Sequence, residues 1–520
     1  MKPLLAAFVL TCAAAHAAAA PTAVVMQGTL TGKSDNGASV FLGVPYAAPP
    51  VGALRWAPPK PALAYGATPR HATAFGASCP QQLNPQGVMM WSTEYMSPAG
   101  PGVAEDCLFL NIWTPKPLDG APLAADLPVL LFIHGGGYTE GSGAVAVYDG
   151  ANVAKQGVVV VNLNYRLGAL GFMAHTALTA EQGASGNYAI QDQIAALHWL
   201  HDNVKAFGGD AAKITIAGQS AGGGSVLALL SSPLAAGLFR AAIVESSPGT
   251  GRYASLAAAE TAGAASLQQW GVESIPQARA LPVSTLMGGG QRGPGGGPIA
   301  DGKVIPAGKS PVTMSNDVPV IIGYTLDDLF GARAGTVTTA DWQQEAAERY
   351  GAKAAEFLRY YPGGSDAQAT ASAKREAADR NMLAPLIDWL GTRGAKQPVY
   401  AYLFSHVEPG PQSAQFGAFH TSEVPYLFDT LHLSPGRGFT AVDSHVVQQF
   451  SGAAVNFVKT GNPNGAGLPV WKPLTANGRD VMNFADDAQA SRIFPVGADA
   501  VMAVGKPPRN PGMPGPPPAK

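Results

Sequence analysis

Apolar runs and helix-spaced apolar positions alternate along most of the chain. The run Leu127–Ile133 is long enough for a buried strand, and Val158–Gly168 begins as a second apolar strand before it turns polar. Between residues 188 and 207, isoleucines and leucines recur at helical spacing, and Gly208 and Gly209 then end the predicted helix. Further short strands are predicted in KITIAG, FRAAIVESS and VPVIIGYT, and a helix in SVLALLSS. This alternation predicts an α/β fold with a largely parallel central sheet and helices on both faces.

Composition sets the size of this fold and excludes one class of partner. The chain has 520 residues, of which 47% are hydrophobic, so it can bury a large core. We expect one domain over residues 21–504, followed by a disordered Pro/Gly-rich tail over residues 505–520. The formal charge of −2 gives no electrostatic reason to expect a nucleic-acid partner.

The first 20 residues are typical of a secretory signal peptide. Lys2 precedes an apolar run, and the alanines near Ala17 offer cleavage sites. The segment is a poor membrane anchor, and no later segment resembles a stable membrane span. We therefore expect an exported protein, in the periplasm or outside the cell. After cleavage only Cys79 and Cys107 remain, and an even pair in an exported protein indicates one disulfide.

The stretch AGQSAGGGS carries the strongest chemical signal. Ser220 lies at its centre, between the strand KITIA and a helix that begins near Ala221. G-x-S-x-G at a strand–helix junction is the nucleophile elbow, in which small neighbours permit a sharp turn that exposes the serine. The helix N-terminus behind it offers free N–H groups to a developing oxyanion.

A serine nucleophile needs oxyanion donors, a base and an acid that orients the base. HGGGY, His134–Tyr138, follows an upstream strand and suits the donors, because glycines let backbone N–H groups approach a substrate. Asp327 and Asp328 follow a later apolar strand, and either could be the acid. Spacing alone does not choose the base from the downstream histidines, which are His406, His420, His432 and His445.

At this point the chain resembles the type-B carboxylesterases, the family of para-nitrobenzyl esterases, animal carboxylesterases and cholinesterases. The resemblance covers nearly the whole mature chain and rests on many motifs in order: FLGVPYAAPPVGALRWAPP, EDCLFLNIWTP, HGGGY, NYRLGALGF, AGQSAGG, GPIADGKVIP, GYTLDDLF, GAFHTSEVPYLF and KTGNPNG. It implies an α/β-hydrolase fold whose inserted loops and helices form a substrate gorge.

The resemblance also implies roles for single residues. Ser220 matches the nucleophile, His420 the catalytic histidine and Asp328 the triad acid, with Asp327 as a competing assignment. The remaining matches are the oxyanion donors Gly136, Gly137 and Ala221, the disulfide Cys79–Cys107, and internal ion pairs of Arg55 with Glu105 and of Arg166 with Asp192.

Two positions depart from the family pattern. The triad acid is usually Glu, so Asp328 is one methylene shorter and its backbone must lie closer to the histidine. The residue before the nucleophile is commonly Glu and is Gln219 here. This change removes a negative charge beside the site, and we therefore expect a neutral small-molecule ester as substrate.

The sequence thus predicts a secreted serine carboxylesterase that acts through an acyl-serine intermediate and needs no metal or organic cofactor. Two alternatives are a non-catalytic binding or adhesion relative on the same fold, and a secreted serine peptidase with related triad geometry. Relatives of the first kind lose the serine or the histidine, and the N-terminal esterase motifs argue against the second.

Overall fold

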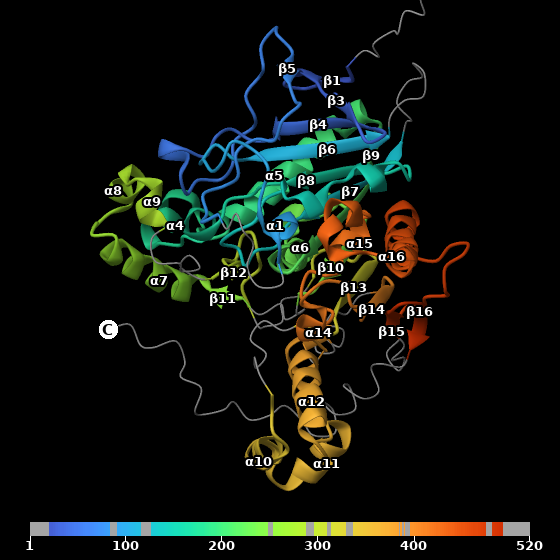
Figure 1. The fold of residues 1–520 in the computed structure, drawn as a ribbon. Coiled ribbons are helices and arrows are strands. Elements are labelled where there is room, and N and C mark those ends of the chain that lie inside the picture. Colours follow the sequence, from blue (N-terminus) through green and yellow to red (C-terminus); the bar gives the residue numbers. More distant parts are fainter. Residues whose placement is uncertain are drawn as a thin grey trace, which may run out of the picture.

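An 11-stranded mixed sheet forms the centre of the protein in the computed structural model (Figure 1). The structure describes residues 20–83, 91–115, 126–247, 253–287, 296–308, 314–328, 336–383, 385–386, 389, 396–474 and 481–491. The expected signal peptide, except its last residue, and the whole expected tail lie outside these residues, as does most of the glycine-rich segment 287–298.

The sheet is parallel in its middle and antiparallel at both ends. Its strands are, in spatial order, β16 (Ala488–Ser491), β15 (Val481–Phe484), β14 (Val399–Phe404), β13 (Val320–Thr325), β10 (Ala241–Glu245), β9 (Gly209–Gln219), β7 (Leu127–Ile133), β8 (Val159–Leu163), β6 (Phe109–Pro115), β4 (Ala38–Pro45) and β3 (Lys33–Asp35). Neighbours from β15 to β8 pair in parallel, whereas β16, β6, β4 and β3 pair antiparallel. The predicted largely parallel sheet is confirmed.

Strand periodicity divides the core into two layers. In β7, Leu131 and Ile133 belong to one hydrophobic cluster and Leu130 and Phe132 to the other, because successive side chains point to opposite faces. The first layer is covered by α5 (Tyr188–Asn203) and α6 (Ala221–Ser231). The second is covered by α2 (Ala151–Ala154), α15 (Val424–Phe428) and α16 (Ala441–Thr460).

Smaller elements surround this core. One satellite cluster joins α3 (Gly168–Phe172), α4 (Thr176–Gln182), α7 (Leu256–Gln269), α8 (Ile275–Ala280) and α9 (Val283–Leu286). The helices α10 (Thr339–Tyr350), α11 (Ala354–Tyr360) and α12 (Asp366–Ala378) project from the rest of the molecule around their own cluster (Figure 1). A short sheet of β1 (Thr22–Val25), β2 (Gly28–Thr31) and β5 (Arg70–His71) lies near the N-terminus, and β11 (Ala254–Ser255) pairs with β12 (Ile299–Ala300).

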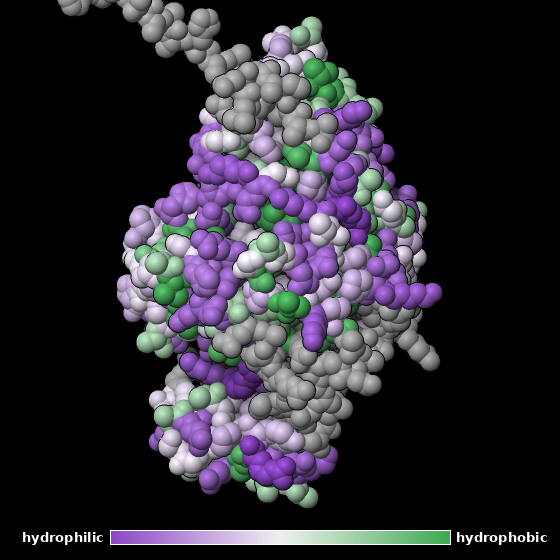
Figure 2. All heavy atoms as spheres, turned by 90° about the vertical axis from the view of Figure 1, so that its right-hand side faces the viewer, coloured by the Kyte–Doolittle hydropathy of each residue, from purple (hydrophilic) through white to green (hydrophobic). Residues whose placement is uncertain are grey.

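The surface is largely polar where Figure 2 shows it. Hydrophilic residues dominate that face, and hydrophobic residues appear there in small separate groups. Within the described ranges, no helix combines the length and the apolar character that crossing a membrane requires.

Candidate active site

Ser220 occupies a strained turn between β9 and α6. Its φ of 57° and ψ of −122° are rare for a residue with a side chain, which the predicted elbow requires. The turn is fixed from both sides: the N–H of Ser220 donates to the carbonyl of Glu245 at 2.9 Å, and its own carbonyl accepts from the N–H of Gly224 at 2.9 Å.

The glycines around Ser220 are required by close packing. A Cβ on Gly222 would lie 1.9 Å from the carbonyl oxygen of Ile133, so α6 touches the end of β7 directly. The two glycines that follow meet other neighbours: a Cβ on Gly223 would lie 2.8 Å from Cβ of Ser247, and one on Gly224 would lie 2.3 Å from the hydroxyl of Tyr138. The whole glycine run therefore lets the first turn of α6 pack against β7, β10 and the HGGGY turn.

The HGGGY turn lies against the serine. Gly136 and Gly137 have φ values of 101° and 61°, which glycine adopts without strain. A Cβ on Gly135 would lie 3.0 Å from Cβ of Ser220, so the two turns are in contact. His134 holds the start of the turn, since its buried carbonyl accepts a hydrogen bond from the hydroxyl of Tyr165 at 2.8 Å. Burial lowers the pKa of His134 to about 4, so its imidazole is neutral near neutral pH.

Of the two candidate acids, Asp328 contacts the histidine. Its Oδ1 lies 2.6 Å from Nδ1 of His420, and both side chains are buried. The carboxylate of Asp327 instead accepts a hydrogen bond from the N–H of Ala418 at 2.9 Å, and the N–H of Asp327 donates to the carbonyl of the same residue at 3.0 Å. Asp327 thereby fixes the loop that carries His420.

The other candidate histidines lie elsewhere. His406 contacts Asp443 and Asp486 through its two ring nitrogens, and His445 contacts Asp487. Among the described residues that line the cavity at Ser220, His420 is the one histidine.

A buried carboxyl group, Glu423, acts on the His420–Asp328 pair, and a second one, Glu245, acts on Glu423. Burial lowers the pKa of His420, but the charge and hydrogen bond of Asp328, with the charge of Glu423, outweigh it and hold the pKa above its usual value. Burial also raises the pKa of Glu423 and of Glu245, whose negative charges would repel one another. The hydroxyl of Ser246 donates to Oε1 of Glu423 at 2.6 Å. Sequence reasoning missed Glu245 and Glu423, although GAFHTSE places the latter three residues after the histidine.

Gln219 also belongs to the site. Its side-chain nitrogen lies 3.2 Å from Nε2 of His420, the ring nitrogen opposite the Asp328 contact. The sequence identified this position as a departure from the family but did not indicate its contact with the imidazole.

Ser220, His420 and Gln219 border a cavity of about 280 Å³. Apolar and aromatic side chains form one part of its wall, and glycines and polar side chains form the rest. The described lining residues are Gln81, Gln82, Leu83, Trp91, Tyr95, Met96, Gly135, Gly136, Gly137, Thr139, Glu140, Gly141, Val145, Tyr148, Gln219, Ser220, His420 and Thr421.

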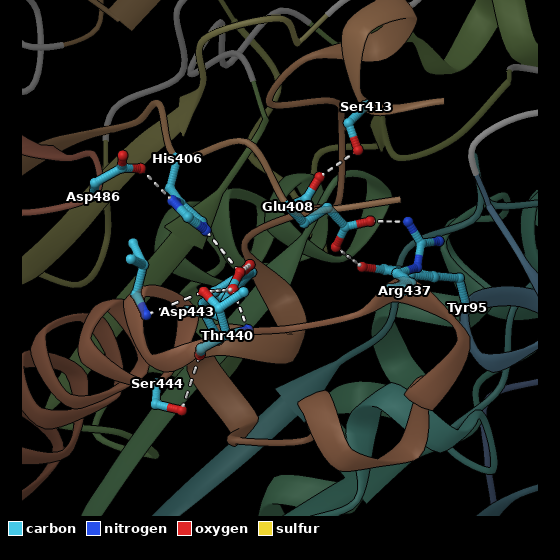
Figure 3. A network of polar contacts seen from close by, with 11 residues as sticks. Tyr95, His406, Glu408, Ser413, Arg437, Thr440, Asp443, Ser444 and Asp486 are labelled. Carbon is cyan, nitrogen blue, oxygen red and sulfur yellow. Dashed lines mark hydrogen bonds and ion pairs between the residues drawn. The ribbon is translucent and has the colours of Figure 1, made fainter. Parts of the chain in front are cut away.

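A polar network fixes the aromatic part of this wall, which includes α1 (Thr93–Met96). The indole N–H of Trp91 donates to the carbonyl of His420 at 3.0 Å, and the hydroxyl of Tyr95 donates to Glu408 at 2.9 Å. Arg437 forms an ion pair with the same Glu408 (Figure 3) and a second one with Glu94 at 3.2 Å. The wall is thereby bonded to the C-terminal part of the chain.

The disulfide lies two residues before another part of the cavity wall, which begins at Gln81. Cys79 and Cys107 are joined, as the sequence indicated. The side-chain amide of Gln81 donates to the carbonyl of Gly141 and accepts from its N–H, both at 2.8 Å. The disulfide-linked segment is therefore bonded directly to the residue that follows the HGGGYTE turn.

Both expected ion pairs are present. Arg55 contacts both carboxylate oxygens of Glu105, at 2.8 and 2.7 Å. Arg166 contacts both oxygens of Asp192, at 2.8 and 2.7 Å, with side chains only 3% and 0% exposed. No group of three or more His, Cys, Asp or Glu residues suited to a metal occurs in the part of the chain that the structure describes.

Comparison with known proteins gives a consistent result. The profile of the carboxylesterase family matches residues 19–497. The chain is similar to fumonisin B1 esterase of Sphingopyxis macrogoltabida, with 34% identity over 85% of this chain and 83% of that protein. It is also similar to phenmedipham hydrolase of Pseudarthrobacter oxydans, with 33% identity over 90% of this chain and 95% of that protein. A solved structure of PNB esterase superimposes with a TM-score of 0.75 at 27% identity, over 92% of this chain and 99% of that one.

Proposed function

Because the chain belongs to the carboxylesterase family and is therefore a carboxylic ester hydrolase, we propose that it cleaves esters through an acyl intermediate on Ser220. The observation that carries this proposal is the 2.6 Å contact between His420 and Asp328 at the cavity that Ser220 lines. A buried acid–imidazole pair at a cavity that a partly buried elbow serine lines suits nucleophilic acyl transfer.

In the proposed reaction, Nε2 of His420 takes the proton of Ser220 as the serine oxygen attacks the ester carbonyl. Asp328 holds the imidazole by its other nitrogen and stabilises the imidazolium that forms. The N–H groups of Gly136, Gly137 and Ala221 bind the oxyanion. His420 then gives its proton to the leaving alcohol and activates a water molecule, which releases the acid and frees Ser220.

Export is part of the proposal. Removal of the N-terminal segment near Ala17–Ala20 would release a mature protein whose single domain extends to residue 504, in the periplasm or the medium. The disulfide is compatible with this route, because such bonds persist in oxidising compartments. N-terminal sequencing of the protein recovered from periplasm and medium tests it, and an intact Met1 there would contradict it.

Ser220→Ala tests the nucleophile. We expect the variant to fold with an unchanged circular dichroism spectrum and to lose kcat for p-nitrophenyl butyrate by a factor on the order of 10⁴ or more. Substantial turnover by the folded variant would overturn the assignment.

A matched pair of variants tests the acid. Asp328→Asn removes the carboxylate that contacts His420, so kcat should fall by about 10⁴-fold. Asp327→Asn makes the same chemical change one residue away, and its loss should be much smaller because Asp327 bonds only the backbone of Ala418 among the described contacts. Equal losses, or the reverse order, would contradict the assignment of Asp328.

A further inference from the structure

Arg437 is not among the described residues that line the cavity, but it contacts the segment that forms the aromatic wall. Its guanidinium donates to the carboxylate of Glu94 at 3.2 Å and to the hydroxyl of Ser92 at 2.7 Å. It also pairs with one carboxylate oxygen of Glu408, and the other oxygen accepts a hydrogen bond from the hydroxyl of Tyr95 at 2.9 Å (Figure 3). One guanidinium is therefore bonded to the wall segment directly at two residues and through Glu408 at a third.

The helix in this wall needs such support. α1 has only four residues, and the side chain of its N-cap residue, Ser92, makes no capping hydrogen bond. A helix of this length is not stable by itself, because the cost of forming its first turn is not recovered by further turns. The position of α1 therefore depends on contacts with other parts of the chain, and Arg437 lies 343 residues after Glu94 in the sequence.

Arg437 also joins this wall to the loop of the proposed base. Its guanidinium carbon lies 5.1 Å from the ring centre of Tyr95 and 5.8 Å from that of Phe419. The two rings themselves pack edge to face with centres 5.9 Å apart, and Phe419 immediately precedes His420. The side chain of Arg437 is 15% exposed and that of Glu408 is 2% exposed, so solvent screens these contacts only weakly.

The wall lies on the side of the cavity where the alcohol leaves. In the proposed reaction His420 gives its proton to the leaving oxygen, so the alcohol part of the ester lies beside this residue. The indole N–H of Trp91 donates to the carbonyl of His420 at 3.0 Å, and Tyr95 packs against the preceding residue. Both aromatic side chains line the cavity and offer ring surfaces to an aromatic group there.

We propose that Arg437 is a positioning residue that gives the cavity a preference for esters of aromatic alcohols, because it holds the wall of Trp91 and Tyr95 in place. This inference rests on the proposed function, since it uses His420 as the proton donor to the leaving alcohol. It assigns selectivity to a side chain that acts through the wall.

The test compares two neutral esters, benzyl acetate and ethyl acetate. They share the acetyl group and differ by a phenyl or a methyl group on the alcohol carbon, and pH-stat titration of acetic acid serves both. Arg437→Met keeps an apolar stem against the two rings but removes the charge and the donors. We expect it to lower the ratio of kcat/KM for benzyl acetate to that for ethyl acetate by roughly five- to tenfold. A loss of folded protein alone does not change this ratio.

Three further variants separate positioning from a general effect. Arg437→Lys keeps the charge and should restore part of the ratio, since an ammonium group can pair with Glu408 but lacks the planar fork. Arg279→Met breaks a similar two-bonded pair with Glu181, at 3.1 and 2.7 Å, and should leave the ratio at the wild-type value. Because Arg437 acts through the wall, Tyr95→Phe should lower the ratio alone but should not lower it further in the Arg437→Met background.

Three results would overturn the inference: an unchanged ratio in Arg437→Met, an equal decrease in Arg279→Met, or independent losses that multiply in the double variant. Failure of the proposed function gives a different result, because Ser220→Ala would then still hydrolyse both esters.

Discussion

The buried ion pair of Arg166 and Asp192 offers a direct test of how the interior is stabilised. Asp192 accepts three hydrogen bonds from Arg166, one from its backbone N–H at 3.1 Å and two from its guanidinium. Arg166→Met removes the two guanidinium bonds and leaves a buried carboxylate with one described donor. The guanidinium also donates to the carbonyl of Ala57 at 2.9 Å, and this bond is lost as well.

The size of the effect follows from these contacts. Hydrogen bonds to charged groups contribute about 1.5–3 kcal/mol each, and loss of one partner of a buried pair costs about 3–5 kcal/mol. We therefore expect Arg166→Met to lower the free energy of unfolding by about 3–5 kcal/mol. Urea unfolding followed by tryptophan fluorescence measures the change through the transition midpoint.

Two controls make the reasoning refutable. The double variant Arg166→Met/Asp192→Leu removes the stranded charge along with its partner, and it should recover at least half of the loss. Lys33→Met breaks the exposed pair of Lys33 with Asp35, and its effect should stay within about 0.5 kcal/mol. A wild-type midpoint for Arg166→Met, or a double variant less stable than the single one, would refute the argument.

Three further predictions concern the active site and its support. Because Asp328 and neighbouring charge hold the pKa of His420 above its usual value, and because the base must be neutral, kcat/KM should fall with decreasing pH through a midpoint above pH 6.5; a pH–rate profile with a midpoint below 6 would contradict this. Gly222→Ala should abolish activity and yield little folded protein, since its Cβ would lie 1.9 Å from the carbonyl oxygen of Ile133; expression and esterase assays check it, and a fully active variant would show that the helix can shift. Cys79→Ser should lower stability by about 3 kcal/mol in thermal unfolding, and the reduced wild-type protein should show the same decrease if the disulfide is responsible.

The sequence was sufficient for the fold and for the elbow, because both depend on local patterns. Apolar runs and helical spacing predicted β7, β9, β10, β13 and α5, and the structure has them at those positions. The elbow follows from the same logic, since a strand, a serine with a glycine two residues away on each side, and a helix are contiguous in the chain.

The choice between Asp327 and Asp328 could not follow from these patterns. The two residues are adjacent and chemically identical, and they differ only in the direction in which their side chains point. The chain pairs with Phe419 at Asp327 and then turns, as the N–H of Asp328 donates to the carbonyl of Thr325 at 3.1 Å. Only this turn directs Asp328 toward His420, and it depends on tertiary contacts made by residues far apart in sequence.

The need for glycine at the positions after Ser220 could not be predicted from the sequence either, because it depends on how the helix packs. Gly223 and Gly224 have no special backbone conformation that a sequence pattern would indicate, since both lie within α6. Their small size is needed because Ser247 and Tyr138 approach the helix from other parts of the chain.

The structure changes the interpretation of Gln219, which stands where the family commonly has Glu. The side-chain nitrogen of Gln219 lies 3.2 Å from Nε2 of His420, so the neutral amide can donate to the nitrogen that must be unprotonated to act as a base. A carboxylate there would favour the protonated imidazole instead and would raise its pKa further. The change from Glu to Gln thus acts first on His420, the proposed base. His420 already contacts the carboxylate of Asp328, and burial favours the neutral forms of Glu423 and Glu245.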